Sequence, residues 1–266
     1  MGLIINPYLS FASSGFNKSG IKFYFHFEES SGNIINAATT AAGYTNGLGD
    51  DADGVKRGDP TYQQTGKIDD AIEYDGTTDH FELGSGDGSD FKFLHDGTDF
   101  TIAFWLKRSD GTNELQGIFG TGEGGSTIGM ALRLDGTNNK ITAKIENGTG
   151  AASSINSSNS WIPDNTTTYY HYIITFEGSS QTWNIYRDNA NNESNTSSLT
   201  VSSSNPSNLP QVGNEPDTGG VENLVGLIDE LVVLTRIITA DERAYLYNSG
   251  DGQLIAWLTS HLLTAW

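Results

Sequence analysis

The sequence predicts an all-β fold, and three observations support this prediction. Short apolar runs alternate with polar residues, as the two faces of half-buried strands require. Glycine is abundant, with 32 residues among 266, and Asn, Ser and Thr crowd the segments between the apolar runs. These residues favour turns, so the chain reverses direction often. Many short strands separated by regular turn signals indicate a sandwich or a barrel.

The alternating pattern places each strand. Ile21, Phe23, Phe25 and Phe27 share one face of the first predicted strand, at residues 21–27. The same pattern predicts further strands at residues 71–74, 80–83, 100–106, 130–134, 140–145, 170–176, 182–186 and 224–234. Asp-Gly at 135–136 and Glu-Gly at 177–178 each predict a hairpin between two of these strands. The polar runs 151–159 and 189–204 are predicted to be long loops.

One short helix is predicted near the C-terminus. Thr239 and Glu242 have the spacing of a capping box, in which each side chain satisfies a backbone N–H of the first turn. The helix continues through Tyr247, and Gly250 is placed to end it in the left-handed conformation. The predicted organisation is an N-terminal arm at 1–20, a sandwich at 21–250 and an apolar tail at 251–266.

The composition excludes several classes of function. The formal net charge is −19, with 33 acidic and 14 basic residues, so a nucleic-acid backbone or an anionic membrane would be repelled. There are no cysteines and therefore no disulfide or thiolate metal site. The acidity serves solubility, or it marks Asp residues that bind a hard cation such as calcium. The first residues lack a basic segment and a long apolar run, so we expect neither a signal peptide nor a membrane span.

Six segments taken together resemble laminin-G-like (concanavalin A-like) jelly-roll domains. They follow the family's order and lie at residues 24–32, 65–76, 100–106, 169–178, 182–188 and 226–233 with the helix after it. Two positions depart from the family pattern: Tyr169 replaces a Trp, and Asn189 stands where the family has Gly. The resemblance implies two antiparallel sheets stacked face to face, and a binding or structural module rather than an enzyme.

The resemblance also implies a candidate metal site. Sandwiches of this kind often carry a structural calcium that ties the first strand to a late one. The matching acidic residues here are Glu28 and Asp229. Calcium takes six to eight oxygen ligands, so backbone carbonyls and water would complete the shell. The alternative is that Asp229 caps a turn or pairs with Arg236.

Aromatic residues near the variable loops are candidates for glycan binding. Trp161, Tyr169 and Trp183 could place a ring against the C–H surface of a sugar, although each could instead belong to the core. A glycosidase would need two carboxylates facing one bound sugar. Asp229 and Glu230 are neighbours in a strand and are expected to point to opposite faces, so we expect no catalytic pair. We interpret His171 as a packing residue.

The two ends of the chain resemble those of phage proteins. Residues 1–8 are similar to the start of many phage structural proteins, and residues 246–252 to the end of laminin-G-like tail and virion proteins. The sequence therefore predicts a virion component that decorates the particle or adheres to host glycans, with arm and tail docking on other subunits or on a second copy. For the tail, the alternative is that it folds back onto its own sandwich beside the N-terminal arm. The alternatives are an extracellular carbohydrate-binding or adhesion domain of cellular origin and, last, a carbohydrate-active enzyme.

Overall fold

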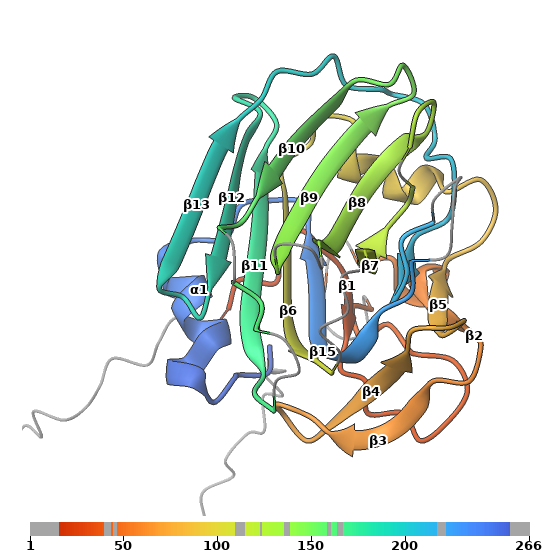
Figure 1. The fold of residues 1–266 in the computed structure, drawn as a ribbon, viewed down its shortest axis with the longest axis vertical. Helices are drawn as coiled ribbons and strands as arrows, with labels where there is room; N and C mark the ends of the chain where they lie inside the picture. Colours follow the sequence, from red (N-terminus) through yellow and green to blue (C-terminus); the bar gives the residue numbers. More distant parts are fainter. Residues whose placement is uncertain are drawn as a thin grey trace, which may run out of the picture.

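The protein is a sandwich of two antiparallel sheets (Figure 1). The structure, a computed structural model, describes residues 16–39, 44, 47–109, 115–122, 124–135, 139–158, 161–163, 167–216 and 222–255. Within these residues one sheet has eight strands and the other has seven. The jelly-roll sandwich predicted from the sequence is confirmed.

Sheet A contains the long central strands. Its path runs β13 (Asn191–Thr196), β12 (Thr182–Arg187), β11 (Tyr170–Glu177), β6 (Phe100–Arg108), β15 (Val225–Leu234), β4 (Asp70–Asp75) and β3 (Thr61–Thr65). β1 (Ile21–Phe25) also pairs with β15, so this late strand joins the first strand to the middle of the sheet.

Sheet B closes the other side of the core. Its order is β10 (Ala152–Asn156), β9 (Lys140–Asn147), β8 (Ile128–Asp135), β7 (Leu115–Gly120), β14 (Gln211–Val212), β5 (His80–Leu83) and β2 (Gly54–Arg57). β8 pairs with β9 from Asp135 opposite Lys140, which confirms the first predicted hairpin, although its turn lies outside the described residues. Three short 3-10 helices are described, η1 (Gly49–Ala52), η2 (Ser89–Leu94) and η3 (Asn248–Gly250).

Two predicted loops contain edge strands instead. The polar run 151–159 forms β10, and the polar run 189–204 begins with β13. Both strands lie at the end of their sheets, and Asn195 Nδ2 on β13 donates to the carbonyl of Ser154 on β10. Edge strands have little apolar surface to bury, so the alternation that reveals a strand is missing from their sequence.

The outer face of sheet A carries a second apolar cluster. Ala103, Ile173 and Val232 point away from the inter-sheet core and pack under the helix α1 (Ala240–Tyr247). Phe16 from the N-terminal segment and Ile255 from the C-terminal segment are buried in the same cluster. The described ends of the chain therefore cover the sheet of their own molecule.

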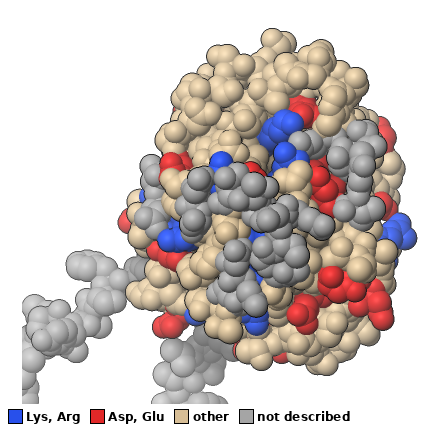
Figure 2. Space-filling view, viewed as in Figure 1, with Lys and Arg blue, Asp and Glu red and all other residues tan. Residues whose placement is uncertain are grey.

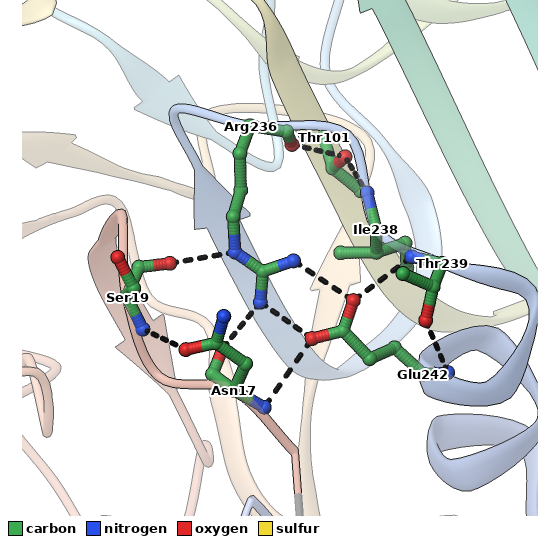
Figure 3. A network of polar contacts seen from close by, with 7 residues as sticks. All are labelled: Asn17, Ser19, Thr101, Arg236, Ile238, Thr239 and Glu242. Carbon is green, nitrogen blue, oxygen red and sulfur yellow. Dashed lines mark hydrogen bonds and ion pairs between the residues drawn. The ribbon is translucent and has the colours of Figure 1, made fainter.

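A polar network fixes the N-terminal segment to the start of α1 (Figure 3). Arg236 donates to both carboxylate oxygens of Glu242, at 2.6 and 2.8 Å, and to the carbonyl of Ser19 at 2.7 Å. Glu242 also accepts from the backbone N–H of Thr239, while Thr239 Oγ1 accepts from the N–H of Glu242. The predicted capping box is confirmed, and its carboxylate has the additional role of binding Arg236.

A bulge in β15 corrects one expectation from the sequence. Asp229 lies opposite Trp105 and Val232 lies opposite Ala103, so β15 has one residue more than β6 between these pairs. The extra residue is Glu230, whose φ is 52°. The bulge turns both Asp229 and Glu230 towards the outer face of sheet A, where strict alternation would have separated them.

The outer face also buries a histidine. His171 on β11 is 2% exposed, and its ring packs against those of Trp105, 4.8 Å away, and Tyr247, 6.2 Å away, which also stack on each other at 6.0 Å. Its backbone N–H donates to Asp188. Burial lowers the pKa of His171 to about 3, so the ring is neutral and serves packing, as the sequence indicated.

We predict that His171 makes the fold sensitive to acid. The unfolded chain binds a proton at this side chain below pH about 6.5, whereas the folded protein does so only below about 3. Between these values the unfolded state binds more protons, so stability falls as the pH is lowered through this window. His171→Phe keeps the ring contacts and should flatten this part of the dependence. Thermal denaturation of the wild type and His171→Phe from pH 7 to 4 checks this prediction. Equal slopes of melting temperature against pH in the two proteins would contradict it.

Candidate functional site

A groove of about 300 Å³ crosses one end of the outer face of sheet A. Its floor is Leu227 on β15, which is 3% exposed. Glu73 on β4 and Lys107 on β6 lie opposite Leu227 on the two neighbouring strands, so one charge stands on each side of the floor. The remaining lining residues are Gln64, Thr65, Ser109 and Thr167. The volume and the mixture of an apolar floor with convergent polar groups are typical of a small-ligand site.

Tyr169 contacts two of the residues that line this groove. Its hydroxyl donates to the carbonyl of Thr65 at 3.0 Å, and the ammonium of Lys107 lies 5.2 Å from the centre of its ring. Burial, followed by the charges of Asp229 and Glu73, raises the pKa of Tyr169, so its hydroxyl remains protonated. Of the three aromatic residues predicted to face a ligand, Tyr169 is the one that contacts groove residues.

The wall on the β3 side is held in place by Asp229. The Oδ2 atom of Asp229 accepts from the backbone N–H groups of Lys67 and Ile68, at 2.7 and 2.9 Å, in the turn between β3 and β4. A Cβ atom at Gly66 would lie 2.3 Å from the carbonyl oxygen of Asp70 and 2.9 Å from Asp229 Oδ2, so this turn requires glycine. Of the two alternatives to a calcium ligand, the structure supports the one in which Asp229 caps a turn. Arg236 pairs with Glu242 instead of Asp229.

Both predicted calcium ligands bind this same turn. Glu28 accepts from the backbone N–H of Asp70, at 3.2 and 3.3 Å. Asp229 is fully buried, and its Oδ1 atom has no hydrogen-bond partner among the described residues. Burial and the neighbouring Glu230 raise the pKa of Asp229 to about 8.

The donor set for a cation is small. A buried oxygen without a partner, beside other carboxylates, fits a cation ligand. The described residues nevertheless contain no group of three His, Cys, Asp or Glu side chains placed to hold a metal ion. Backbone carbonyls and water would have to supply most of the ligands.

Glu230 is engaged elsewhere on the outer face. The hydroxyl of Tyr24 donates to its Oε2 atom, and Nδ1 of His26 lies 3.1 Å from its Oε1 atom. The Tyr24 hydroxyl also accepts from the backbone N–H of Ile255, so this network holds the C-terminal segment. Glu230 is 6% exposed and Asp229 is 0% exposed. The two carboxylates share a face, but they fix the turn and the C-terminal segment rather than line the groove.

The two tryptophans predicted to face a ligand lie in the core. Trp183 has no exposed surface; it packs on Phe176 and Phe100 and donates through Nε1 to Ser153. Trp161 is 9% exposed, and the guanidinium of Arg187 covers its ring. The prediction that these two rings face a ligand is wrong, because both rings are buried in the core between the sheets.

The sequence analysis missed the two charged residues of the groove. Glu73 interrupts the apolar pattern of β4 at an outward position, and Lys107 follows Trp105 at the outward positions of β6. This alternation could have shown that both face the same side. Glu73 and Lys107 lie on opposite sides of Leu227 because β15 pairs between β4 and β6. No local sequence pattern reveals this strand order.

Solved structures with a similar fold are binding domains. The chain resembles the binding domain of botulinum neurotoxin DC in complex with SialylT, with a TM-score of 0.61 and 10% identity over 86% of this chain and 51% of that one. It also resembles the binding domain of botulinum neurotoxin serotype C1, with a TM-score of 0.62 and 12% identity over 86% and 52% of the two chains. The chain thus spans about half the length of these domains, and the likeness shows the fold.

The family assignment comes from the sequence comparison. No curated protein matches the chain. The family model Laminin_G_3, described as concanavalin A-like lectin/glucanases superfamily, matches residues 75–242, which is more than half of the chain. This range contains most of the strands of both sheets, the groove residues Lys107 and Leu227, and Tyr169 beside them. The chain belongs to the Laminin_G_3 family of the concanavalin A-like lectin/glucanase superfamily.

Proposed function

We propose that the protein is a non-enzymatic glycan-binding module, and that the groove over Leu227 is its binding site. The observation that carries this proposal is the position of Glu73 and Lys107 on the two sides of an apolar floor, with Tyr169 in contact with the lining residues Thr65 and Lys107. A carboxylate accepts from sugar hydroxyls, an ammonium donates to them, and the half-buried ring of Tyr169 beside the groove offers an apolar surface for sugar C–H groups. The buried positions of Asp229 and Glu230 argue against a hydrolase, because a catalytic pair must reach the glycosidic bond.

The structural neighbours agree with this kind of function. One neighbouring binding domain was solved in complex with SialylT, and another neighbour is from botulinum neurotoxin type C, whose cell entry depends on interaction with two ganglioside molecules. Those ligands belong to the neighbours; what they support for this chain is glycan recognition as a class. The described residues contain no helix that is long and apolar enough to cross a membrane.

We further propose that the module is part of a virion, with an extracellular adhesion domain of cellular origin as the alternative. The resemblance of both chain ends to phage proteins supports this proposal. The predicted docking of the arm and tail on other subunits or a second copy concerns residues 1–15 and 256–266, which lie outside the described residues. Residues 16 and 255 already pack on the chain's own sheet, so such docking would involve the segments beyond them.

Glycan binding should depend on Tyr169. Tyr169→Ala removes the ring beside Lys107 and the bond to Thr65, and should weaken binding about tenfold, or about 1.4 kcal/mol. Tyr169→Phe keeps the ring and should lose less. A glycan array followed by calorimetry on its best ligand checks this, with melting temperatures as the folding control. Equal affinities of the wild type and a folded Tyr169→Ala protein would place the site elsewhere.

Calcium, if bound at Glu28 and Asp229, should stabilise the fold. A ligand at one hundred times its Kd adds about 2.7 kcal/mol to the stability of the native state. Chelation should therefore lower the melting temperature, and calcium should restore it in the wild type but not in Asp229→Asn. A melting temperature that does not respond to exhaustive chelation or to added calcium would remove the site.

Two truncations separate folding from docking. Ending the chain at Ile255 keeps every described contact of the tail and should preserve the melting temperature. Ending it at Gly252 removes the buried Ile255 side chain and should cost about 1.5–3 kcal/mol. If residues 256–266 dock on a partner, the first truncation should also abolish oligomerisation or incorporation into particles. An unchanged assembly state, measured by light scattering, would show that these residues are not an anchor.

A further inference from the structure

We propose that Glu73 determines the specificity of the groove, admitting neutral sugars and rejecting sugars that carry a carboxylate. This inference rests on the proposed function and adds the chemical class of the ligand. In this role Glu73 accepts hydrogen bonds from the hydroxyls of a neutral sugar and repels an acidic one.

The geometry leaves Glu73 available to a ligand. It is half-buried at the edge of the groove, opposite Leu227, and its carboxylate makes no hydrogen bond or ion pair within the described part of the chain. Lys107 lies opposite Leu227 from the other side, so β15 separates the two charges. A ligand over Leu227 would therefore contact both groups without first breaking a salt bridge between them.

Lys107 does not cancel the negative charge of Glu73. Its ammonium rests over the Tyr169 ring, 5.2 Å from the ring centre, and pairs with no carboxylate in the described residues. The negative charges of Glu73 and Asp229 both act on the Tyr169 hydroxyl. The local balance in the groove is at most neutral, in a chain of net charge −19.

These charges favour a neutral ligand over an acidic one. A carboxylate that entered beside Glu73 would meet a like charge, and the loss of water from the groove would strengthen that repulsion. A sugar hydroxyl at the same place would donate a charge-assisted hydrogen bond to Glu73. Specificity of this kind arises from repulsion of the wrong ligand as much as from attraction of the right one.

The experiment uses matched pairs of glycans that differ by one carboxylate. Suitable pairs are sialylated oligosaccharides with their desialylated counterparts, and glucan oligosaccharides with their C6-oxidised glucuronate counterparts. Affinities are measured by calorimetry for the wild type, Glu73→Gln and Glu177→Gln. Glu177 is exposed at the end of β11, so its substitution changes the net charge equally without touching the groove.

The wild type should bind the neutral member of a pair at least about tenfold more tightly, and Glu73→Gln should reduce this ratio at least fivefold. Glu177→Gln should leave the ratio unchanged, and added salt should lower it in the wild type. If a folded Glu73→Gln protein still binds with the same ratio of neutral to acidic affinity, the role of Glu73 is overturned while the proposed function stands. A wild type that prefers the acidic member has the same consequence. A folded wild type that binds neither member of any pair, nor any glycan on the array, overturns the proposed function and the role of Glu73 with it.

Discussion

The bulge at Glu230 is the local constraint on which the outer face of sheet A depends. β15 pairs with β1, β4 and β6, and one extra residue in it directs Asp229 and Glu230 to the same side. Asp229 then holds the turn between β3 and β4, while Glu230 holds Tyr24 and, through it, the C-terminal segment. A positive φ at a glutamate is costly, so the surrounding contacts must stabilise it.

The groove is a consequence of this arrangement. Its floor, Leu227, lies on β15 two residues before Asp229, and its far wall includes Gln64 and Thr65 of β3, directly before the turn that Asp229 caps. Tyr169, directly before β11, donates to Thr65 on β3, so segments that are distant in sequence meet beside the groove. A site held by strands and buried hydrogen bonds is pre-organised, which lowers the entropic cost of binding a flexible glycan.

The charge of the protein gives the groove its context. Acidic side chains are spread over the face seen in Figure 2, with a large group at the lower right, where Figure 1 shows β2, β3 and β4. Such a surface repels polyanions. Within it, the groove offers both a donor and an acceptor beside an apolar floor, a combination suited to neutral polyhydroxylated ligands.

The sequence by itself determined the fold class, most strands of the core and the capped helix, because these depend on local alternation and on the spacing of Thr239 and Glu242. It also offered the turn role of Asp229 as one alternative, while the role of Tyr169 in ligand binding stays a prediction. It missed the glycine-containing core strand β7 and the edge strands β10 and β13, which lack apolar alternation. It also left open whether Trp161 and Trp183 face a ligand or the core, since a tryptophan near a loop has the same sequence in either case. Only the tertiary structure decided that Glu73 and Lys107 meet across Leu227, and that a bulge sets Asp229 beside Glu230. Strand order and bulges arise from hydrogen bonds between distant segments, and these leave no periodic signal in the chain.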